Sequence, residues 1–293
     1  MEARGSQPPV ATGAEAFRLP GDGRLGCLLL HGFTASAPQF ARLGRRLQKA
    51  GIAASAPLLP GHGTCPADLA AARWTQWTQA ALQAYDELAA ECRQVVPIGL
   101  SMGGLLALHV AAQRPVAGVV ALAAALKMAD RRLFLLPVLK YLLPYVPAAT
   151  EEVEAERRAR EAGGSPRRRP GLIGPTAACP WVNYDVFPLR AVAELLQLAR
   201  TVRGELARVT APALIIQARD DGTVRPDSAA YIHAHIGSSR KKRIWLESGG
   251  HLLVTDPAAP QVEEEILAFL NELRAPDAAT GAQAQHAPQD GRN

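Results

Sequence analysis

Cysteine is scarce in this chain, and the few cysteines form no recognisable pattern. Among the 293 residues, Cys27, Cys65, Cys92 and Cys179 are scattered, and no two of them form a C-x-x-C pair. This spacing argues against a zinc site and against a disulfide framework. We expect reduced thiols, with Cys27 buried in a strand, and we expect no metal ion or cofactor.

Long hydrophobic runs are also lacking. The longest apolar stretch, Val116 to Leu126, is too short to span a bilayer. Met1 to Pro20 is polar and has no apolar core of the signal-peptide kind. We therefore expect a cytoplasmic protein without stable membrane insertion.

Negative charge is slightly deficient, because 32 Lys and Arg oppose 27 Asp and Glu, a formal net charge of +5. The excess is local: arginines cluster at 157–160 and 167–169, and Arg240-Lys241-Lys242-Arg243 forms a second run. Such runs occur in patches that bind nucleic acid or anionic membranes. No aromatic residue interleaves them and no nucleic-acid motif is present, so we interpret them as solvated faces and expect no nucleic-acid partner.

Strand-like and helix-like segments alternate between two expected tails, 1–18 and 276–293. Nearly all-apolar strands that alternate with helices predict an α/β fold with a mostly parallel sheet covered on both faces. We assign the core to residues 19–126 and 191–275. The expected strands are 25–30, 52–57, 95–100, 116–123, 213–218 and 243–247, and the expected helices are 40–50, 74–92 and 262–273.

Residues 127–190 interrupt this alternation and contain no convincing strand. Two apolar patches, Leu133 to Leu136 and Val138 to Leu143, are separated by Pro137 and end at Pro144. An insertion between core strands is expected over the carboxyl edge of the sheet, where a small helical cap or lid would cover an active site. A surface excursion with its own packing, or a membrane-facing patch, is the alternative.

The segment Gly99-Leu100-Ser101-Met102-Gly103-Gly104 is the most informative feature. A short apolar run precedes it and a helix-like run follows it, which is the order of a nucleophile elbow in an α/β-hydrolase. The turn is strained, and glycine lets neighbouring backbone approach closely. Ser101 also stands at a helix N-terminus, where free N–H groups can stabilise an oxyanion. The alternative is a glycine-rich turn with a capping serine.

A serine nucleophile needs a general base, and the base needs an orienting group, in the chain order Ser, acid, His. Two late segments supply them at predicted strand ends: Asp220-Asp221 after 213–218, and His251 after 243–247. Spacing alone permits either aspartate. Other histidines remain alternatives to His251 as the base: His31, His62, His109, His233 and His235.

The chain resembles bacterial carboxylesterases and monoacylglycerol lipases, the small-lid esterases of the α/β-hydrolase superfamily. The matching pieces are H-G-F-T at 31–34, P-G-H-G at 60–63, G-L-S-M-G-G at 99–104, D-x-x-V-x-P at 221–226 and S-G-G-H at 248–251. The resemblance spans roughly residues 25–274 and is weakest across the insertion. It implies an α/β-hydrolase fold, a mostly parallel central sheet with helices on both faces and a small helical cap insertion.

The resemblance also implies roles. Ser101 would attack an ester carbonyl, His251 would transfer the proton, and Asp221 would orient the imidazole, since Val224 and Pro226 follow Asp221 at the family's spacing. The family has one aspartate here, so the doubling with Asp220 is a departure. The backbone N–H groups of Phe33 and Met102 would bind the oxyanion. The residues expected to line the substrate pocket are Phe33, His62, Leu135 and Leu136.

The sequence is compatible with three functions. The first is hydrolysis of a small lipophilic ester, with a short or medium acyl chain or a monoacylglycerol. The second is a thioesterase, amidase or C–C hydrolase, because one triad supports several reactions. The third is a non-catalytic ligand receptor with the same fold, which usually accompanies a broken triad. The sequence leaves the oligomeric state open between monomer and dimer.

Overall fold

A seven-stranded sheet forms the centre of the molecule in the computed structural model, which describes residues 9–148, 172–173, 182–255 and 257–274. The strand order is β1-β3-β2-β4-β5-β10-β11. All neighbouring pairs are parallel except β1 with β3. The strands are β1 (Phe17–Leu19), β2 (Leu25–Leu30), β3 (Ala53–Ala56), β4 (Gln94–Leu100), β5 (Val119–Leu122), β10 (Ala213–Ala218) and β11 (Lys241–Leu246).

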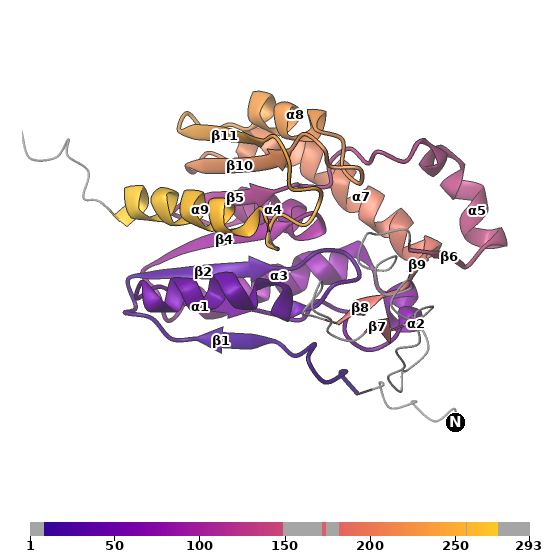
Figure 1. The fold of residues 1–293 in the computed structure, drawn as a ribbon, viewed down its shortest axis with the longest axis horizontal. Helices are drawn as coiled ribbons and strands as arrows, with labels where there is room; N and C mark the ends of the chain where they lie inside the picture. Colours follow the sequence, from indigo (N-terminus) through magenta and orange to yellow (C-terminus); the bar gives the residue numbers. More distant parts are fainter. Residues whose placement is uncertain (1–8, 149–171, 174–181, 256, 275–293) are drawn as a thin grey trace, which may run out of the picture.

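Helices cover both faces of the sheet (Figure 1). The η1 turn (Ala37–Phe40), α1 (Ala41–Lys49) and α9 (Ala259–Arg274) pack on one face, and α3 (Trp74–Ala89), α4 (Met102–Gln113), α7 (Leu189–Glu205) and α8 (Asp227–His235) pack on the other. Each face has its own cluster of buried apolar side chains. Because β2, β4 and β10 are covered on both sides, their sequences are almost continuously apolar. The α/β fold class is confirmed.

The described part of the insertion lies at the carboxyl ends of the strands, where α5 projects beyond the sheet (Figure 1). It comprises η2 (Arg131–Leu135), α5 (Leu136–Leu142), β6 (Tyr145–Pro147), β7 (Leu172–Ile173), β8 (Asn183–Tyr184) and β9 (Val186–Pro188). The expectation that 127–190 holds no strand was therefore wrong. β6 pairs with β9, and β7 with β8, in ribbons of two or three residues that are too short to show an alternating pattern.

The expected N-terminal tail also differs from the structure where it is described. Ala14 is fully buried, Ala11 N donates a hydrogen bond to Gly63 O, and β1 extends the sheet. Residues 1–8 and the expected tail 276–293 lie outside the described residues.

The remaining helices are α2 (Pro66–Ala71) and η3 (Leu206–Arg208), while α7, which follows β9 directly, was not anticipated.

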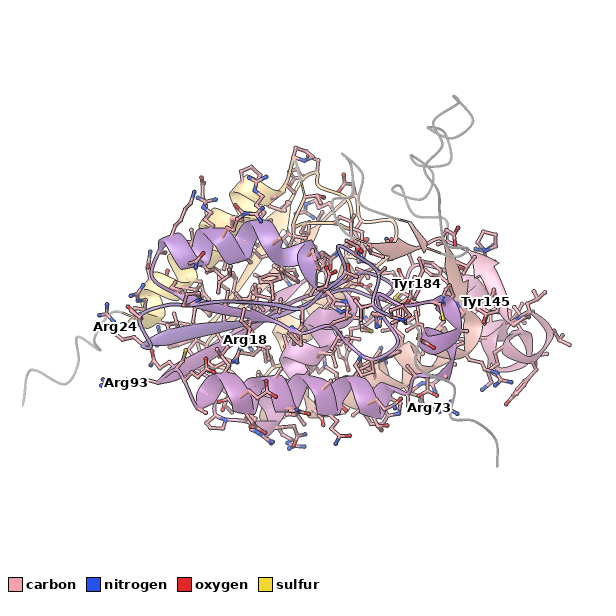
Figure 2. All side chains as sticks on the ribbon, turned by 90° about the horizontal axis from the view of Figure 1, so that it is seen from below. Arg18, Arg24, Arg73, Arg93, Tyr145 and Tyr184 are labelled. Atoms are coloured by element: carbon pink, nitrogen blue, oxygen red, sulfur yellow. The ribbon has the colours of Figure 1, made fainter. Side chains whose placement is uncertain are left out.

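Figure 2 labels residues at both ends of the sheet. Arg24 and Arg93 lie at the end opposite the insertion, whereas Tyr145 and Tyr184 lie on the insertion side.

The run at 240–243 enters the edge strand β11, where Lys242 pairs with Glu265 at 2.8 Å. The arginines at 157–169 and Cys179 lie outside the described residues, and Cys27 is buried in β2 as expected. Across the described ranges, the structure has no helix with the length and apolar character of a membrane span.

Candidate active site

The turn between β4 and α4 holds Ser101 in a strained backbone conformation. Its φ is +56° and its ψ is −113°, values that a residue with a side chain rarely adopts. The surrounding hydrogen bonds enforce this geometry, because Ser101 N donates to Leu122 O on β5 at 2.9 Å. A Cβ on Gly99 would clash with the Gly103 backbone, and a Cβ on Gly103 would clash with the Leu30 carbonyl oxygen. Glycine at both positions is therefore a steric requirement of the turn.

The loop that follows β2 contacts the loop 59–63, which follows β3 at the same carboxyl end of the sheet. His31 Nε2 accepts a hydrogen bond from Leu59 N at 3.1 Å, so its Nδ1 carries the proton that is donated to Gly32 O. Gly32 N in turn donates to the Gln39 side chain at 2.8 Å. These bonds fix the backbone just before Phe33.

Two backbone N–H groups in this area lack an acceptor within the described part of the chain. Among the described residues, no hydrogen bond is donated by the N–H of Phe33 or by that of Met102. Met102 is the first residue of α4, where helix N–H groups lack an intrahelical partner. Both N–H groups are thus available to an anionic oxygen.

His251 and Asp221 form a hydrogen-bonded pair at the carboxyl ends of β11 and β10. His251 Nδ1 lies 2.9 Å from Asp221 Oδ2, and the Asp221 side chain is fully buried. Asp221 Oδ1 accepts from the N–H groups of Thr223 and Val224 at 2.8 and 2.9 Å. These contacts aim the carboxylate at the imidazole.

Asp220 has a different environment from its neighbour, since it is exposed and points to the loop that follows β11. Its two carboxylate oxygens accept from Gly250 N at 2.9 Å and Gly249 N at 3.3 Å. It contacts the segment that carries His251 but not the ring itself. The structure thus separates the two aspartates that spacing alone left equivalent.

Two alternative bases are buried and committed elsewhere. Burial lowers the pKa of His31 to about 4, and both of its ring nitrogens already hold backbone partners. Burial, reinforced by the neighbouring His31, holds the pKa of His62 well below its usual value. His62 Nδ1 contacts Pro60 O at 3.1 Å, and among the described residues its buried Nε2 has no hydrogen-bond partner.

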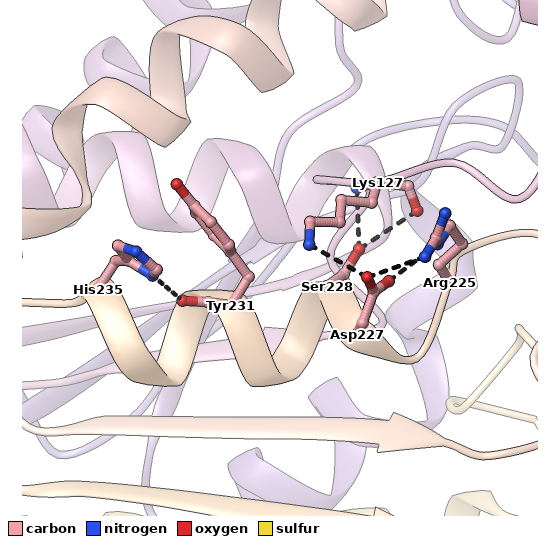
Figure 3. Close-up of polar contacts among 6 residues, drawn as sticks. All are labelled: Lys127, Arg225, Asp227, Ser228, Tyr231 and His235. Carbon is pink, nitrogen blue, oxygen red and sulfur yellow. Dashed lines mark hydrogen bonds and ion pairs between the residues drawn. The ribbon is translucent and has the colours of Figure 1, made fainter.

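The three other alternative bases, His109, His233 and His235, have partners outside the turn that holds Ser101. His109, two turns into α4, contacts Glu205 of α7 at 2.7 Å. His235 stacks on Tyr231 and contacts the carbonyl oxygen of that residue (Figure 3). His233, on the same helix α8, is half-buried.

The turn that carries Asp221 is tied to the start of the insertion (Figure 3). Lys127 N donates to Ser228 Oγ at 2.8 Å, and Lys127 Nζ pairs with Asp227 at 3.1 Å. Arg225 N donates to Lys127 O, and a single β-bridge joins Met128 to Val224. The acid turn and the first residues of the insertion are therefore one connected unit.

The residues expected to line the substrate pocket lie in different environments. The Phe33 ring lies 5.8 Å from that of Phe187, 6.2 Å from that of Trp77 and 6.3 Å from that of His62. Leu136 is buried in a small cluster with Leu189 and Val192, against which Phe33 packs. Leu135 is 44% exposed and lies outside that cluster, so the structure gives no support to its expected place in the pocket.

Ser101 and His251 lie at the same edge of the sheet, but among the described residues no direct hydrogen bond joins them. Contacts between nucleophile and base are often long before a substrate binds. Gln217 also belongs to this site and was not expected from the sequence, because its amide nitrogen lies 2.7 Å from Asp221 Oδ2. A polar residue inside the apolar run 213–218 was the available signal.

This arrangement of a parallel sheet, helices on both faces and a strand-turn-helix serine near its centre defines the α/β-hydrolase class. The comparisons with known proteins agree with that class. The chain belongs to the family described as serine aminopeptidase, S33, whose model matches residues 22–258.

Curated relatives extend over nearly the whole chain. A thermostable monoacylglycerol lipase of Bacillus sp. (strain H-257) is 30% identical over 267 residues, which cover 90% of this chain and 96% of that enzyme. A carboxylesterase of Bacillus subtilis (strain 168) is 25% identical over 250 residues, 84% of this chain and 92% of that enzyme. The resemblance to this group of enzymes is confirmed.

Solved structures show the same fold. A structure from work on LipS and LipT, two metagenome-derived lipolytic enzymes, has 31% identity and a TM-score of 0.77, with coverage of 90% of this chain and all of that one. The monoacylglycerol lipase of Paleococcus ferrophilus has 18% identity and a TM-score of 0.67, with coverage of 88% and 99%. The second likeness supports the fold alone.

Proposed function

We propose that this enzyme, a carboxylic ester hydrolase, cleaves esters of short to medium acyl chains or monoacylglycerols through an acyl-enzyme on Ser101. The observation that carries the proposal is the His251–Asp221 pair, 2.9 Å from Nδ1 to Oδ2, at the sheet edge where the strained Ser101 turn also lies. Two relatives from Bacillus are named monoacylglycerol lipase and carboxylesterase, and these names support carboxylic esters as the substrate class.

In the proposed mechanism, Ser101 Oγ attacks the ester carbonyl carbon while His251 Nε2 accepts its proton. Asp221 keeps the other ring proton on Nδ1 and offsets the charge of the imidazolium. The N–H groups of Phe33 and Met102 donate to the oxyanion of the tetrahedral intermediate. When the bond to the leaving alcohol breaks, His251 returns the proton to that alcohol, and a water molecule then cleaves the acyl-enzyme by the same steps.

The substrate pocket is proposed to extend from Phe33 toward the insertion, which acts as the lid. Phe33 packs against both the main core and the small cluster around Leu136. His62 borders the same ring. An apolar wall of this kind suits a lipophilic acyl group, so the described part of the insertion sets chain-length preference.

A panel of p-nitrophenyl esters with acyl chains from two to sixteen carbons, together with monoacylglycerols, tests the proposal. We expect hydrolysis by the wild type with a maximum at short to medium chains, and a loss of about 10⁴-fold or more in Ser101→Ala. Thioester and amide substrates with matched acyl groups provide the comparison, and faster turnover of either one would contradict ester hydrolysis. Equal activity in wild type and Ser101→Ala would contradict the serine mechanism.

A further inference from the structure

Gln217 is the single polar side chain in β10, whose sequence is Ala-Leu-Ile-Ile-Gln-Ala, and it is fully buried. An amide inside an apolar strand costs folding free energy unless its polar atoms are hydrogen-bonded. A leucine at this position would fill the space without that cost. The position therefore calls for a reason other than packing.

The contacts of Gln217 lead directly to the acid. Gln217 Nε2 donates to Asp221 Oδ2 at 2.7 Å, and the same oxygen accepts from His251 Nδ1 at 2.9 Å. Because a carboxylate can only accept, the amide must present its nitrogen to Asp221. Among the described residues, Gln217 Oε1 has no hydrogen-bond partner, so only one half of the amide is satisfied. Gln217 therefore hydrogen-bonds Asp221 in an orientation that leaves its own side-chain oxygen without a partner among the described residues.

We propose that Gln217 is a positioning residue that holds Asp221 Oδ2 toward His251 and moderates the negative charge that the imidazole meets. This inference rests on the reaction proposed above. Asp221 Oδ1 is held independently by two backbone N–H groups, whereas the partners of Oδ2 among the described residues are Gln217 and His251. Without the amide, Oδ2 is more basic, free to accept water, and less well ordered.

Other charged groups surround this pair and stay constant when Gln217 is replaced. Asp220 is bonded to the loop before His251, and Arg219 pairs with Glu247 at 3.1 Å on the exposed edge. On the other side of the acid turn, Asp227 is paired with Lys127 and Arg225 (Figure 3). A changed pH profile in a Gln217 variant therefore reports the missing amide.

Gln217→Leu tests the proposal, with Ile215→Leu on the same face of β10 as the matched control. We expect kcat/KM for a p-nitrophenyl ester to fall about tenfold in Gln217→Leu through kcat, with KM unchanged. The acid limb of the kcat/KM profile moves to higher pH, because the bare carboxylate stabilises the protonated ring more strongly. The thermal midpoint stays equal or rises. A purely structural role would instead lower the midpoint and leave the limb in place.

Gln217→Glu provides a rescue. The protonated carboxyl keeps an O–H donor toward Oδ2, so activity at low pH exceeds that of Gln217→Leu. As pH rises and the new carboxyl ionises, its repulsion of Asp221 removes that advantage. Identical pH profiles for the Glu and Leu variants would overturn the proposal.

An NMR titration of the His251 ring separates this inference from the proposed function, since it needs no substrate. The pH of half-protonation is compared between wild type and Gln217→Leu, with His251→Gln used to assign the signal. A higher midpoint in Gln217→Leu supports the role of Gln217 whatever the substrate, and equal midpoints overturn it. Failure of the ester panel in wild type counts against the proposed function alone.

Discussion

Two histidine–carboxylate pairs occur in the described part of the chain, and they differ in what surrounds them. His251 and Asp221 meet at 2.9 Å at the carboxyl ends of β11 and β10, and Asp221 is buried among three further donors. His109 and Glu205 meet at 2.7 Å between α4 and α7. His109 is eight residues beyond Ser101, about 12 Å along a helix. A short histidine–carboxylate contact is therefore by itself no sign of catalysis.

Replacing the two histidines gives the largest contrast. We expect His251→Ala to lower kcat/KM about 10⁴- to 10⁶-fold, because Ser101 loses its proposed general base. His109→Ala should stay within about threefold of wild type, since that ring contacts a helix rather than the reacting atoms. Steady-state hydrolysis of a p-nitrophenyl ester measures both, with circular dichroism to confirm folding. Comparable losses in the two variants would remove the distinction.

Replacing the carboxylate partners, Asp221 and Glu205, extends the comparison between the two pairs. Asp221→Asn should lower kcat about 10³- to 10⁴-fold, because an amide at this position favours the wrong tautomer of His251. Glu205→Gln should leave kcat within about twofold and lower the free energy of unfolding by about 1–3 kcal/mol, as a hydrogen-bonded charge between helices is lost. Kinetics and urea unfolding of both variants separate the two effects. A large loss of stability with little loss of rate in Asp221→Asn would reverse the assignment.

We expect the buried histidines His31 and His62 to make stability depend on acid pH. Because burial lowers the pKa of His31 to about 4, the unfolded chain binds a proton between pH 6.5 and 4 that the folded chain does not. Stability should therefore fall as pH falls through this window, by about 3 kcal/mol from His31 alone. His62, with its pKa also lowered by burial, adds in the same direction. Urea unfolding at pH 7 and pH 4.5 checks the loss, and His31→Gln should reduce it, whereas an equal loss in this variant would contradict the role of His31.

Asp220 should show the smallest effect. Asp220→Asn leaves one acceptor for the two N–H groups of Gly249 and Gly250, so the loop before His251 is held less firmly. We expect kcat to fall about two- to tenfold with KM unchanged, since exposed hydrogen bonds contribute modestly. Asp86→Asn, an exposed carboxylate paired with Arg114 on α4's far end, is the control and should have no effect. A loss in Asp220→Asn as large as in Asp221→Asn would reopen the choice of acid.

The sheet and the Ser101 turn could be predicted because they depend on local patterns. Apolar runs such as Ala213 to Ala218 identify buried strands, and glycine at 99 and 103 meets a steric need of the turn. The placement of Asp221 and His251 at one edge follows from the parallel order of the strands. Each of these features depends on residues within one element or in neighbouring elements.

The remaining features depend on side-chain direction and distant pairing. Asp220 and Asp221 are adjacent, so spacing could not tell which one faces the ring, whereas the contacts of the folded chain separate them. β1 and the ribbon of β6 with β9 are three residues long, too short for a periodic signal, and β6 pairs with a segment about 40 residues away. Leu135 and Leu136 looked alike in sequence, yet only Leu136 is buried.

Labelling with a fluorophosphonate probe tests the central claim most directly. The probe forms a bond from its phosphorus to an activated serine oxygen and releases fluoride, so the rate reports nucleophile activation without any choice of ester. We predict one adduct, mapped by peptide mass spectrometry to Ser101, which forms at similar rates in wild type and His109→Ala and is nearly abolished in His251→Ala. An adduct elsewhere, or undiminished labelling of Ser101 in His251→Ala, would contradict the account.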